Sequence, residues 1–334
     1  MKLAIVHGSV AAIEVLRRGL AGESGVTIVW TAGDAERAVA HALAERPDAA
    51  LIAASLDGAT ELARTLATEL ACPVIVIADD STLSRANTFD AMTAGAVDVI
   101  VLPRLASGVA DVVALRGKLA LLRRLIGRET PAPLPRPTAA GPSPRPVIVA
   151  LGASTGGPQA LAVVLAGLAP SPNAAVLIVQ HIDPQFSEGM AQWLSRSSGL
   201  EVELATAGVR PRGGTVYVAA TGQHMIVEPD GSLGFTSRPR EAAHKPSIDV
   251  LFTSLIRRRH PGVAALLTGM GRDGASGLAA LRAAGWRTIA QDEASSVVYG
   301  MPKAAADLRA ASHVLPLDQI GATIARFVRD LASG

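Results

Sequence analysis

The amino-acid sequence predicts an α/β protein with two domains, each built on a parallel β-sheet. The chain has 334 residues, which is more than one core of ordinary size usually takes. Short apolar runs alternate with amphipathic segments at intervals of about 25 residues, the rhythm of βα units. A proline-rich segment at 127–146 separates two such series. We therefore expect one domain at 1–126, a linker at 127–146 and a second domain at 147–334.

The first domain is expected to be a doubly wound (βα)5 unit. Its five β-strands lie in the runs KLAIVH, VTIVWTA, AALIAAS, PVIVIA and DVIVLP. The segments between and after them predict helices near 10–20, 34–46, 60–70, 83–94 and 106–126, and Asp34 is placed to cap the second of these. This order predicts a five-stranded parallel sheet with helices on both faces.

The second domain is also expected to be an α/β layer structure. Strands are predicted near 147–152, 175–180, 263–268 and 287–290. Between the second and third of these strands lies an insert with four short runs, EVELATA, TVYVAAT, HMIVEP and SLGFTS. Their brevity and the Gly and Pro residues between them predict antiparallel β-hairpins.

Composition and charge exclude several classes of function. A formal charge of +2 and an aromatic content of 3% argue against a nucleic-acid-binding protein. No apolar run approaches the roughly 20 residues of a membrane helix, and the run LAIV after Lys2 is too short for a signal peptide, so we expect a cytoplasmic protein without membrane insertion. The single cysteine, Cys72, rules out an internal disulfide and cannot form a zinc site by itself.

The segment GASTGGP at 152–158 lies between an apolar strand and a predicted helix. It fits the G-x-S-x-G pattern in which a tight turn exposes a nucleophilic serine, here Ser154. A dinucleotide-binding fingerprint would require a second glycine at that position, and a Walker loop would require a following Gly-Lys pair. By itself the segment remains open to three interpretations: a nucleophile turn, an anion-binding loop or a simple tight turn.

Candidate partners of Ser154 follow the ends of other predicted strands. Functional groups of an open parallel sheet meet at the carboxyl ends of its strands. His181 follows the run AVLIVQ and Asp273 follows VAALLT, so both share an edge with Ser154 and could serve as base and orienting acid. Each residue also has a simpler interpretation, since His181 could be a hydrogen-bonded loop residue and Asp273 could cap a helix starting at Ala275.

His313 offers a competing base. The order Ser154, Asp273, His313 is that of α/β-hydrolases, which would make the chain a small-molecule hydrolase. However, His313 precedes the apolar run VLPL, and a strand there would place it at the opposite edge of the sheet. Edge placement therefore favours His181.

Backbone amides near Ser154 could stabilise an oxyanion. Pro158 in the first turn of the next helix and the free amides of Thr155 to Gly157 form a favourable environment for negative charge. The glycine-rich segment TGMG at 268–271 could supply a second donor, for which Met270 is the expected residue.

Five segments stand out along the second domain: GASTGGP at 152–158, QH at 180–181, HKPSIDVLF at 244–252, LTGMGRDGASG at 267–277 and QDEASSVVYGMP at 291–302. Together they span nearly all of 147–334. In sequence and in order they resemble the chemotaxis protein-glutamate methylesterases, the CheB family.

The resemblance implies an activity and a set of roles. Family members hydrolyse glutamate methyl esters on methyl-accepting chemotaxis receptors and release methanol, and some also deamidate receptor glutamines. Carried over by position, Ser154 is the nucleophile, His181 the base and Asp273 its orienting acid, while Thr155 and Met270 lie beside the oxyanion. The resemblance implies no metal and no cofactor, and it suggests the receptors and a chemosensory histidine kinase as partners.

The first domain resembles a response-regulator receiver that has lost its chemistry. A working receiver needs carboxylates that hold Mg²⁺, one of them phosphorylated, together with a hydroxyl and a lysine that contact the phosphate. The acidic pair falls on His7 and Gly8, the phospho-acceptor on Ala53, the hydroxyl on Ala78 and the lysine on Leu102. We therefore expect a pseudoreceiver that is not switched by aspartyl phosphorylation.

Two alternatives remain for this chain: a substitute phospho-acceptor in the first domain, and a function without catalysis. Asp57, Asp79 and Asp80 lie close to the acceptor position, but Asp57 falls in the following loop and fits an ordinary turn or helix cap. The loss of receiver chemistry also admits a second class of function, a non-catalytic signalling adaptor.

Overall fold

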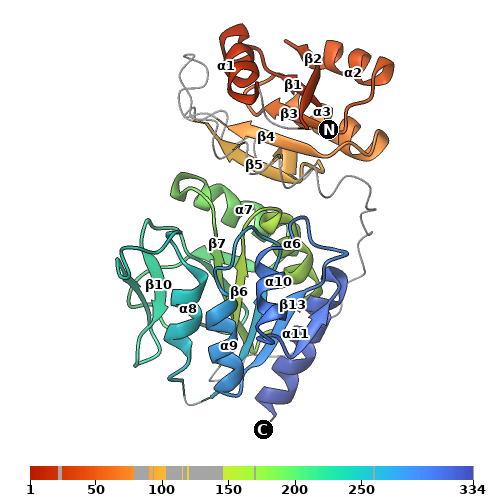
Figure 1. Cartoon of the computed structure of the whole chain (residues 1–334). Helices are drawn as coiled ribbons and strands as arrows, with labels where there is room; N and C mark the ends of the chain where they lie inside the picture. Colours follow the sequence, from red (N-terminus) through yellow and green to blue (C-terminus); the bar gives the residue numbers. More distant parts are fainter. Residues whose placement is uncertain are drawn as a thin grey trace. The chain divides into compact units, whose positions relative to one another are not determined.

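The computed structural model describes residues 1–21, 25–78, 90–92, 94–102, 115, 119, 146–168, 171–258 and 260–333. The chain separates into two compact units, Met1–Gly127 and Arg128–Gly334 (Figure 1). The predicted linker and most of the predicted helices at 83–94 and 106–126 lie outside the described residues, as do Asp79 and Asp80.

The first unit contains the predicted five-stranded parallel sheet. Every neighbouring pair of strands is parallel, and the order β2-β1-β3-β4-β5 is that of a doubly wound fold. β3 and β4 are buried along their whole length, as expected for parallel strands covered on both faces. The strands are β1 (Lys2–Val6), β2 (Thr27–Ala32), β3 (Ala49–Ala53), β4 (Val74–Ala78) and β5 (Asp98–Val101).

Three helical segments of this unit follow the predicted positions. Asp34 caps the second one as expected, because its carboxylate accepts a hydrogen bond from the Arg37 N–H at 2.8 Å. The third changes to a π-helical turn at Thr65–Glu69. The helices are α1 (Val10–Leu20), α2 (Ala35–Ala44) and α3 (Ala59–Arg64).

The residues that the sequence assigns to the phosphorylation positions of a receiver lie at the carboxyl edge of this sheet. His7 follows β1, Ala53 ends β3, Ala78 ends β4 and Leu102 follows β5, and all four are buried. Asp57 lies exposed in the turn after β3. A receiver-like fold is therefore combined with an apolar and imidazole-bearing edge.

The second unit is built on a seven-stranded sheet in which all neighbouring strands are parallel. Its order is β14-β13-β12-β6-β7-β9-β8, and a separate antiparallel hairpin is formed by β10 and β11. The strands are β6 (Val147–Ala153), β7 (Ala174–Gln180), β8 (Glu201–Leu204), β9 (Thr215–Val218), β10 (His224–Val227), β11 (Leu233–Thr236), β12 (Val263–Leu266), β13 (Arg287–Gln291) and β14 (His313–Leu315).

The prediction for the insert was half right. β10 and β11 form the expected hairpin, but β8 and β9 belong to the main sheet and are parallel to it. Val216 pairs with Val176 of β7, and Glu201 pairs with Thr215. The residues of β9 are all buried, which is typical of a parallel strand covered on both faces, while β8 is the partly exposed edge strand.

Six helices of the described second unit cover the two faces of this sheet. α6, α7 and α11 pack together on one face, and α8, α9 and α10 pack with the hairpin on the other. None of the helices in the part of the chain that the structure describes has the length and apolar character needed to span a bilayer. The helices are α6 (Gly157–Leu168), α7 (Ser187–Ser198), α8 (Ile248–Leu255), α9 (Ala275–Ala283), α10 (Met301–Asp307) and α11 (Leu317–Ala332).

The chain direction across the sheet reverses between β6 and β12. From β6 the chain proceeds outward through β7 to β9 and β8, whereas β12 lies on the other side of β6 and leads to β13 and β14. In open parallel sheets, ligands bind outside the carboxyl ends of the strands at such a switch point. This edge is therefore where the fold favours a functional site.

Candidate active site

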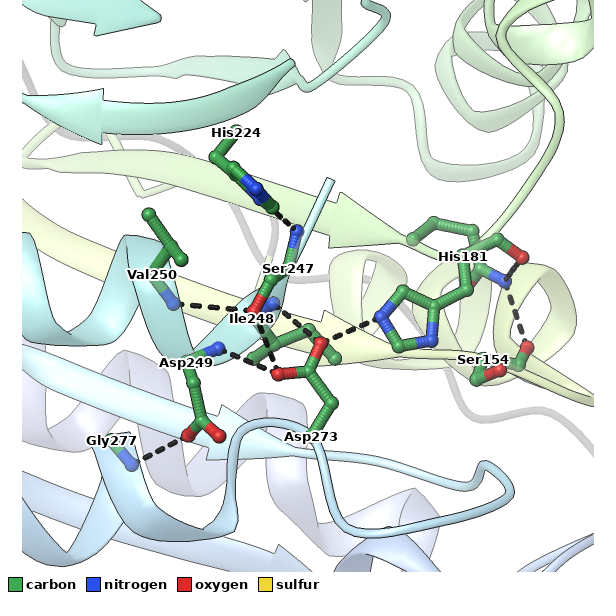
Figure 2. Close-up of polar contacts among 10 residues, drawn as sticks. Ser154, His181, His224, Ser247, Ile248, Asp249, Val250, Asp273 and Gly277 are labelled. Atoms are coloured by element: carbon green, nitrogen blue, oxygen red, sulfur yellow. Dashed lines mark hydrogen bonds and ion pairs between the residues drawn. The ribbon is translucent and has the colours of Figure 1, made fainter. Parts of the chain in front are cut away.

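Three predicted residues meet at the switch point of the second sheet. Ser154 follows β6 directly, His181 follows β7 directly, and Asp273 lies near the end of the loop between β12 and α9. His181 Nε2 lies 2.8 Å from Asp273 Oδ2, and Figure 2 shows Ser154 on the other side of the imidazole. The structure thus brings together the serine, the histidine and the aspartate, which were expected on one edge because each follows a predicted strand.

The Asp273 carboxylate is bound to the start of α8. Oδ1 accepts hydrogen bonds from Ser247 Oγ at 2.8 Å and from the Asp249 N–H at 3.0 Å. Oδ2 accepts from the Ile248 N–H at 2.8 Å (Figure 2). The interpretation of Asp273 as the cap of the helix starting at Ala275 is wrong, because Gly274 occupies that position without a side-chain bond. Asp273 instead accepts hydrogen bonds from backbone N–H groups in the first turn of α8, where the helix dipole favours a negative charge.

These contacts control the charge of Asp273. Burial acts to raise the pKa of its carboxyl group, but hydrogen bonds from His181, Ile248 and Asp249 and the charge of His181 outweigh burial and lower the pKa to about 2. The group is therefore a carboxylate at neutral pH and can only accept hydrogen bonds. It follows that His181 donates from Nε2.

The opposite nitrogen of His181 is left available. In a neutral imidazole with its proton on Nε2, Nδ1 carries a lone pair. His181 Nδ1 is buried and has no hydrogen-bond partner among the described residues. In Figure 2 this edge of the ring is turned toward Ser154, although no hydrogen bond joins the two described side chains in this structure. Such bonds often tighten only when substrate binds.

The backbone of Ser154 is fixed from several directions. Its N–H donates to the Thr268 carbonyl at 3.0 Å, and its carbonyl accepts from Gln180 Nε2 and from the Gly157 N–H, both at 2.8 Å. Close packing also requires glycine opposite the serine, since a Cβ on Gly269 would lie 2.6 Å from Ser154 Cβ. The candidate nucleophile therefore sits on a turn with little freedom.

The two predicted oxyanion residues lie on the loops that flank Ser154. Thr155 is buried, and Met270 is 46% exposed. In the described part of the chain, no hydrogen bond uses the backbone N–H of either residue. Both amides thus remain available to an oxyanion, and Thr155 lies just before the start of α6 at Gly157, where the helix dipole favours negative charge.

Two histidines near the site were not assigned roles from the sequence. His244 stacks on His181, with ring centroids 4.1 Å apart and an angle of 18° between the ring planes. His224 is completely buried, and its Nδ1 accepts from the Ser247 N–H at 3.0 Å. The N-cap pattern of Ser247 before an apolar run could have indicated the start of α8, but no local signal places it against Asp273.

His313 does not belong to this site. It is the first residue of β14, and so it lies at the amino edge of the sheet, as predicted. Its ring meets Phe327 edge-on, and its Nδ1 lies 3.0 Å from Ser312 Oγ. The described residues also contain no group of three or more His, Cys, Asp or Glu side chains arranged to hold a metal ion.

A serine, a histidine and an aspartate gathered at the carboxyl ends of a parallel sheet are typical of serine hydrolases. Comparison with known proteins narrows this class. A family model described as CheB methylesterase matches residues 149–324. The chain belongs to the CheB methylesterase family.

Full-length relatives and a solved structure agree with this membership. A Cupriavidus metallidurans protein named protein-glutamate methylesterase/protein-glutamine glutaminase 2 is 43% identical over 96% of each chain. A Pseudomonas fluorescens protein named protein-glutamate methylesterase/protein-glutamine glutaminase 1 is 42% identical over 96% of this chain and 97% of its own. The CheB methylesterase catalytic domain of Thermotoga maritima superposes with a TM-score of 0.52 and 30% identity, covering 54% of this chain and 98% of that structure.

Proposed function

We propose that this chain is a protein-glutamate methylesterase that removes methyl groups from glutamate side chains of methyl-accepting chemotaxis receptors. The observation that carries the proposal is the His181–Asp273 pair, which leaves Nδ1 of the imidazole free on the side of Ser154. The names of the full-length relatives support an enzyme rather than a non-catalytic adaptor.

In the proposed mechanism Ser154 Oγ attacks the ester carbonyl carbon while its proton moves to His181 Nδ1. Asp273 stabilises the imidazolium that forms. The N–H groups of Thr155 and Met270 donate to the developing oxyanion. His181 then returns the proton to the departing methanol, which leaves the glutamyl group esterified to Ser154.

Hydrolysis of this intermediate restores the enzyme. A water molecule gives a proton to His181 Nδ1 and attacks the acyl carbon, and His181 then protonates Ser154 Oγ as the glutamate carboxylate is released. Ester and water thus yield carboxylate, a proton and methanol. The same steps on a glutamine side chain would release ammonia, and we propose this deamidation as a second activity, in line with the glutaminase part of the relatives' names.

We further propose that the first unit is a pseudoreceiver, so that the esterase is not switched by aspartyl phosphorylation. Ala53 occupies the acceptor position, and buried Ala78 and Leu102 occupy the hydroxyl and lysine positions. We propose a docking role for this unit, with the receptors or a chemosensory histidine kinase as partner, in line with the parallel sheet that its described residues form. A cytoplasmic location stays a prediction from the sequence.

Release of labelled methanol from methylated receptors tests the proposed activity. Ser154→Ala should lower the rate by at least about 10³-fold, because it removes the attacking oxygen. Ser333→Ala, at the end of α11, is the matched control and should behave as wild type. A wild-type protein that releases no methanol, or a Ser154→Ala variant with an unchanged rate, would overturn the proposal.

A further inference from the structure

His244 lies flat against the candidate catalytic histidine. The two ring centroids are 4.1 Å apart, and the ring planes differ by 18°. The side chain of His181 is only 8% exposed, whereas His244 is on the surface. His244 therefore covers one face of the His181 ring without filling either of its nitrogen positions.

The contact supplies a restraint that the hydrogen bonds of His181 do not. Within the described structure, the ring is held at one edge by the bond from Nε2 to Asp273, while Nδ1 has no partner. Rotation about the Cβ–Cγ bond of histidine has a broad energy minimum, so one bond leaves the ring free to tilt. A second ring in parallel contact opposes this tilt, because tilting drives edge atoms into its face.

The segment that carries His244 is anchored to the same elements as Asp273. Three residues after His244, the Ser247 N–H donates to His224 Nδ1 at 3.0 Å, and Ser247 Oγ donates to Asp273 at 2.8 Å. The stacking ring and the orienting carboxylate thus share one support at the start of α8. A shift of this support would move both residues relative to His181.

Charge distinguishes the two imidazoles. Burial and the nearby charge of His181 lower the pKa of His244, and these effects exceed the opposing influence of Asp273. His244 is therefore uncharged at neutral pH. Of these two imidazoles, His181 is the one joined to the Asp273 carboxylate by a hydrogen bond in the described structure, and this bond favours the protonated form of His181.

We propose that His244 is a positioning residue, whose ring face holds the imidazole of His181 with Nδ1 directed at Ser154. The inference rests on the proposed roles of Ser154 and His181, but not on the identity of the ester. The property required is a flat ring at this position rather than a titratable nitrogen. Phenylalanine at position 244 should therefore still position the His181 ring, whereas alanine should not.

Labelling of Ser154 in the full-length chain by a dye-linked fluorophosphonate tests this role. In this reaction Ser154 Oγ displaces fluoride from phosphorus, so its rate reports serine activation whatever the natural substrate. His244→Ala should slow labelling about tenfold, and His244→Phe should stay within about threefold of wild type. His313→Ala removes a histidine in an edge-on ring contact at the opposite edge of the sheet and should leave the rate unchanged.

Methanol release separates positioning from substrate binding. His244→Ala should lower kcat with little change in KM, and His244→Phe should restore kcat. An unchanged labelling rate in His244→Ala, an equal loss in His244→Phe, or a wild-type chain that is not labelled at Ser154 would overturn the role. The expected labelling pattern without methanol release would instead refute the proposed methylesterase and leave the positioning role standing.

Discussion

The Asp273 carboxylate and the Ile248 N–H are joined by a 2.8 Å hydrogen bond, so the acid of the candidate triad also binds the first turn of a helix that begins 25 residues earlier. Ser247 and Asp249 donate to the same carboxylate. The orientation of His181 therefore depends on how α8 is placed, and the stability of the start of α8 depends on the charge of Asp273. One substitution should disturb both.

Asp273→Asn should reduce activity far more than it reduces folding stability. An asparagine side chain has one NH₂ group in place of a carboxylate oxygen, so some of the N–H groups that donate to Asp273 would lose their acceptor. It would also no longer hold the proton of His181 on Nε2. We expect methanol release to fall by about 10²- to 10⁴-fold and the free energy of unfolding by about 1–3 kcal/mol. Asp318→Asn, in the exposed first turn of α11, should change neither. Near-wild-type methanol release in Asp273→Asn would contradict the proposed role.

The contribution of Asp273 to stability should disappear in acid. Its pKa is lowered from 3.8 to about 2 in the folded chain, so the carboxylate stabilises the fold fully above its unfolded pKa. That contribution, roughly 2 kcal/mol, is lost as the pH falls from about 4 through about 2. Urea unfolding should therefore show that the wild type has a larger free energy of unfolding than Asp273→Asn at pH 6, and that this difference is smaller at pH 2.5. A difference that is equal at both values would refute the assigned direction of the shift.

Thr268 should be essential for the shape of the Ser154 turn. Its hydroxyl donates to the Thr155 carbonyl at 2.9 Å and accepts from the Val298 N–H at 2.8 Å, and the side chain is completely buried. In Thr268→Val the new side chain has nearly the same shape, but the Thr155 carbonyl and the Val298 N–H lose their hydrogen bonds to the hydroxyl. This substitution should cost about 1–3 kcal/mol in urea unfolding and lower methanol release, while Thr268→Ser should recover most of both. A serine variant as impaired as the valine variant would show that the hydroxyl is not responsible.

Gly269 should not tolerate a side chain. An added Cβ would lie 2.6 Å from Ser154 Cβ and 2.6 Å from Met301 Sδ, well inside van der Waals contact. Gly269→Ala should therefore displace Ser154 and reduce both methanol release and fluorophosphonate labelling by about 10²-fold. Gly222→Ala is the matched control, since nothing lies within 4 Å of its added Cβ. Equal rates of methanol release in Gly269→Ala and Gly222→Ala would contradict this prediction, because they would mean that the Ser154 turn accommodates the added methyl group.

Much of the fold follows from local sequence patterns. Apolar runs with intervening amphipathic segments locate the strands of both sheets, and the carboxyl edge then collects Ser154, His181 and Asp273 from three separate strand ends. The same logic correctly sends His313 to the opposite edge. Assigning a residue to one edge needs no knowledge of strand order, because each residue is placed relative to its own strand.

The parts that sequence patterns could not predict depend on packing between distant segments. TVYV and EVEL are short strands between turns, a pattern that fits a hairpin as well as the edge of a parallel sheet. The binding of Asp273 to the amides of α8 joins segments 25 residues apart, and no residue near Asp273 signals it. The stack of His244 on His181 arises in the same way, from two loops that only the folded sheet brings together.

The first unit should not accept phosphate from acetyl phosphate. A phosphorylated receiver needs an acceptor carboxylate, Mg²⁺ ligands and a cation for the phosphate, and the corresponding strand ends carry Ala53, His7 and Leu102, all buried. We expect no acid-stable, base-labile phosphate after incubation with acetyl phosphate and Mg²⁺, and no change in methanol release. Ala53→Asp should also remain unphosphorylated, because a single carboxylate restores neither the metal site nor the cation. Incorporation into wild type that is abolished by Asp57→Asn would instead identify Asp57 as a substitute acceptor.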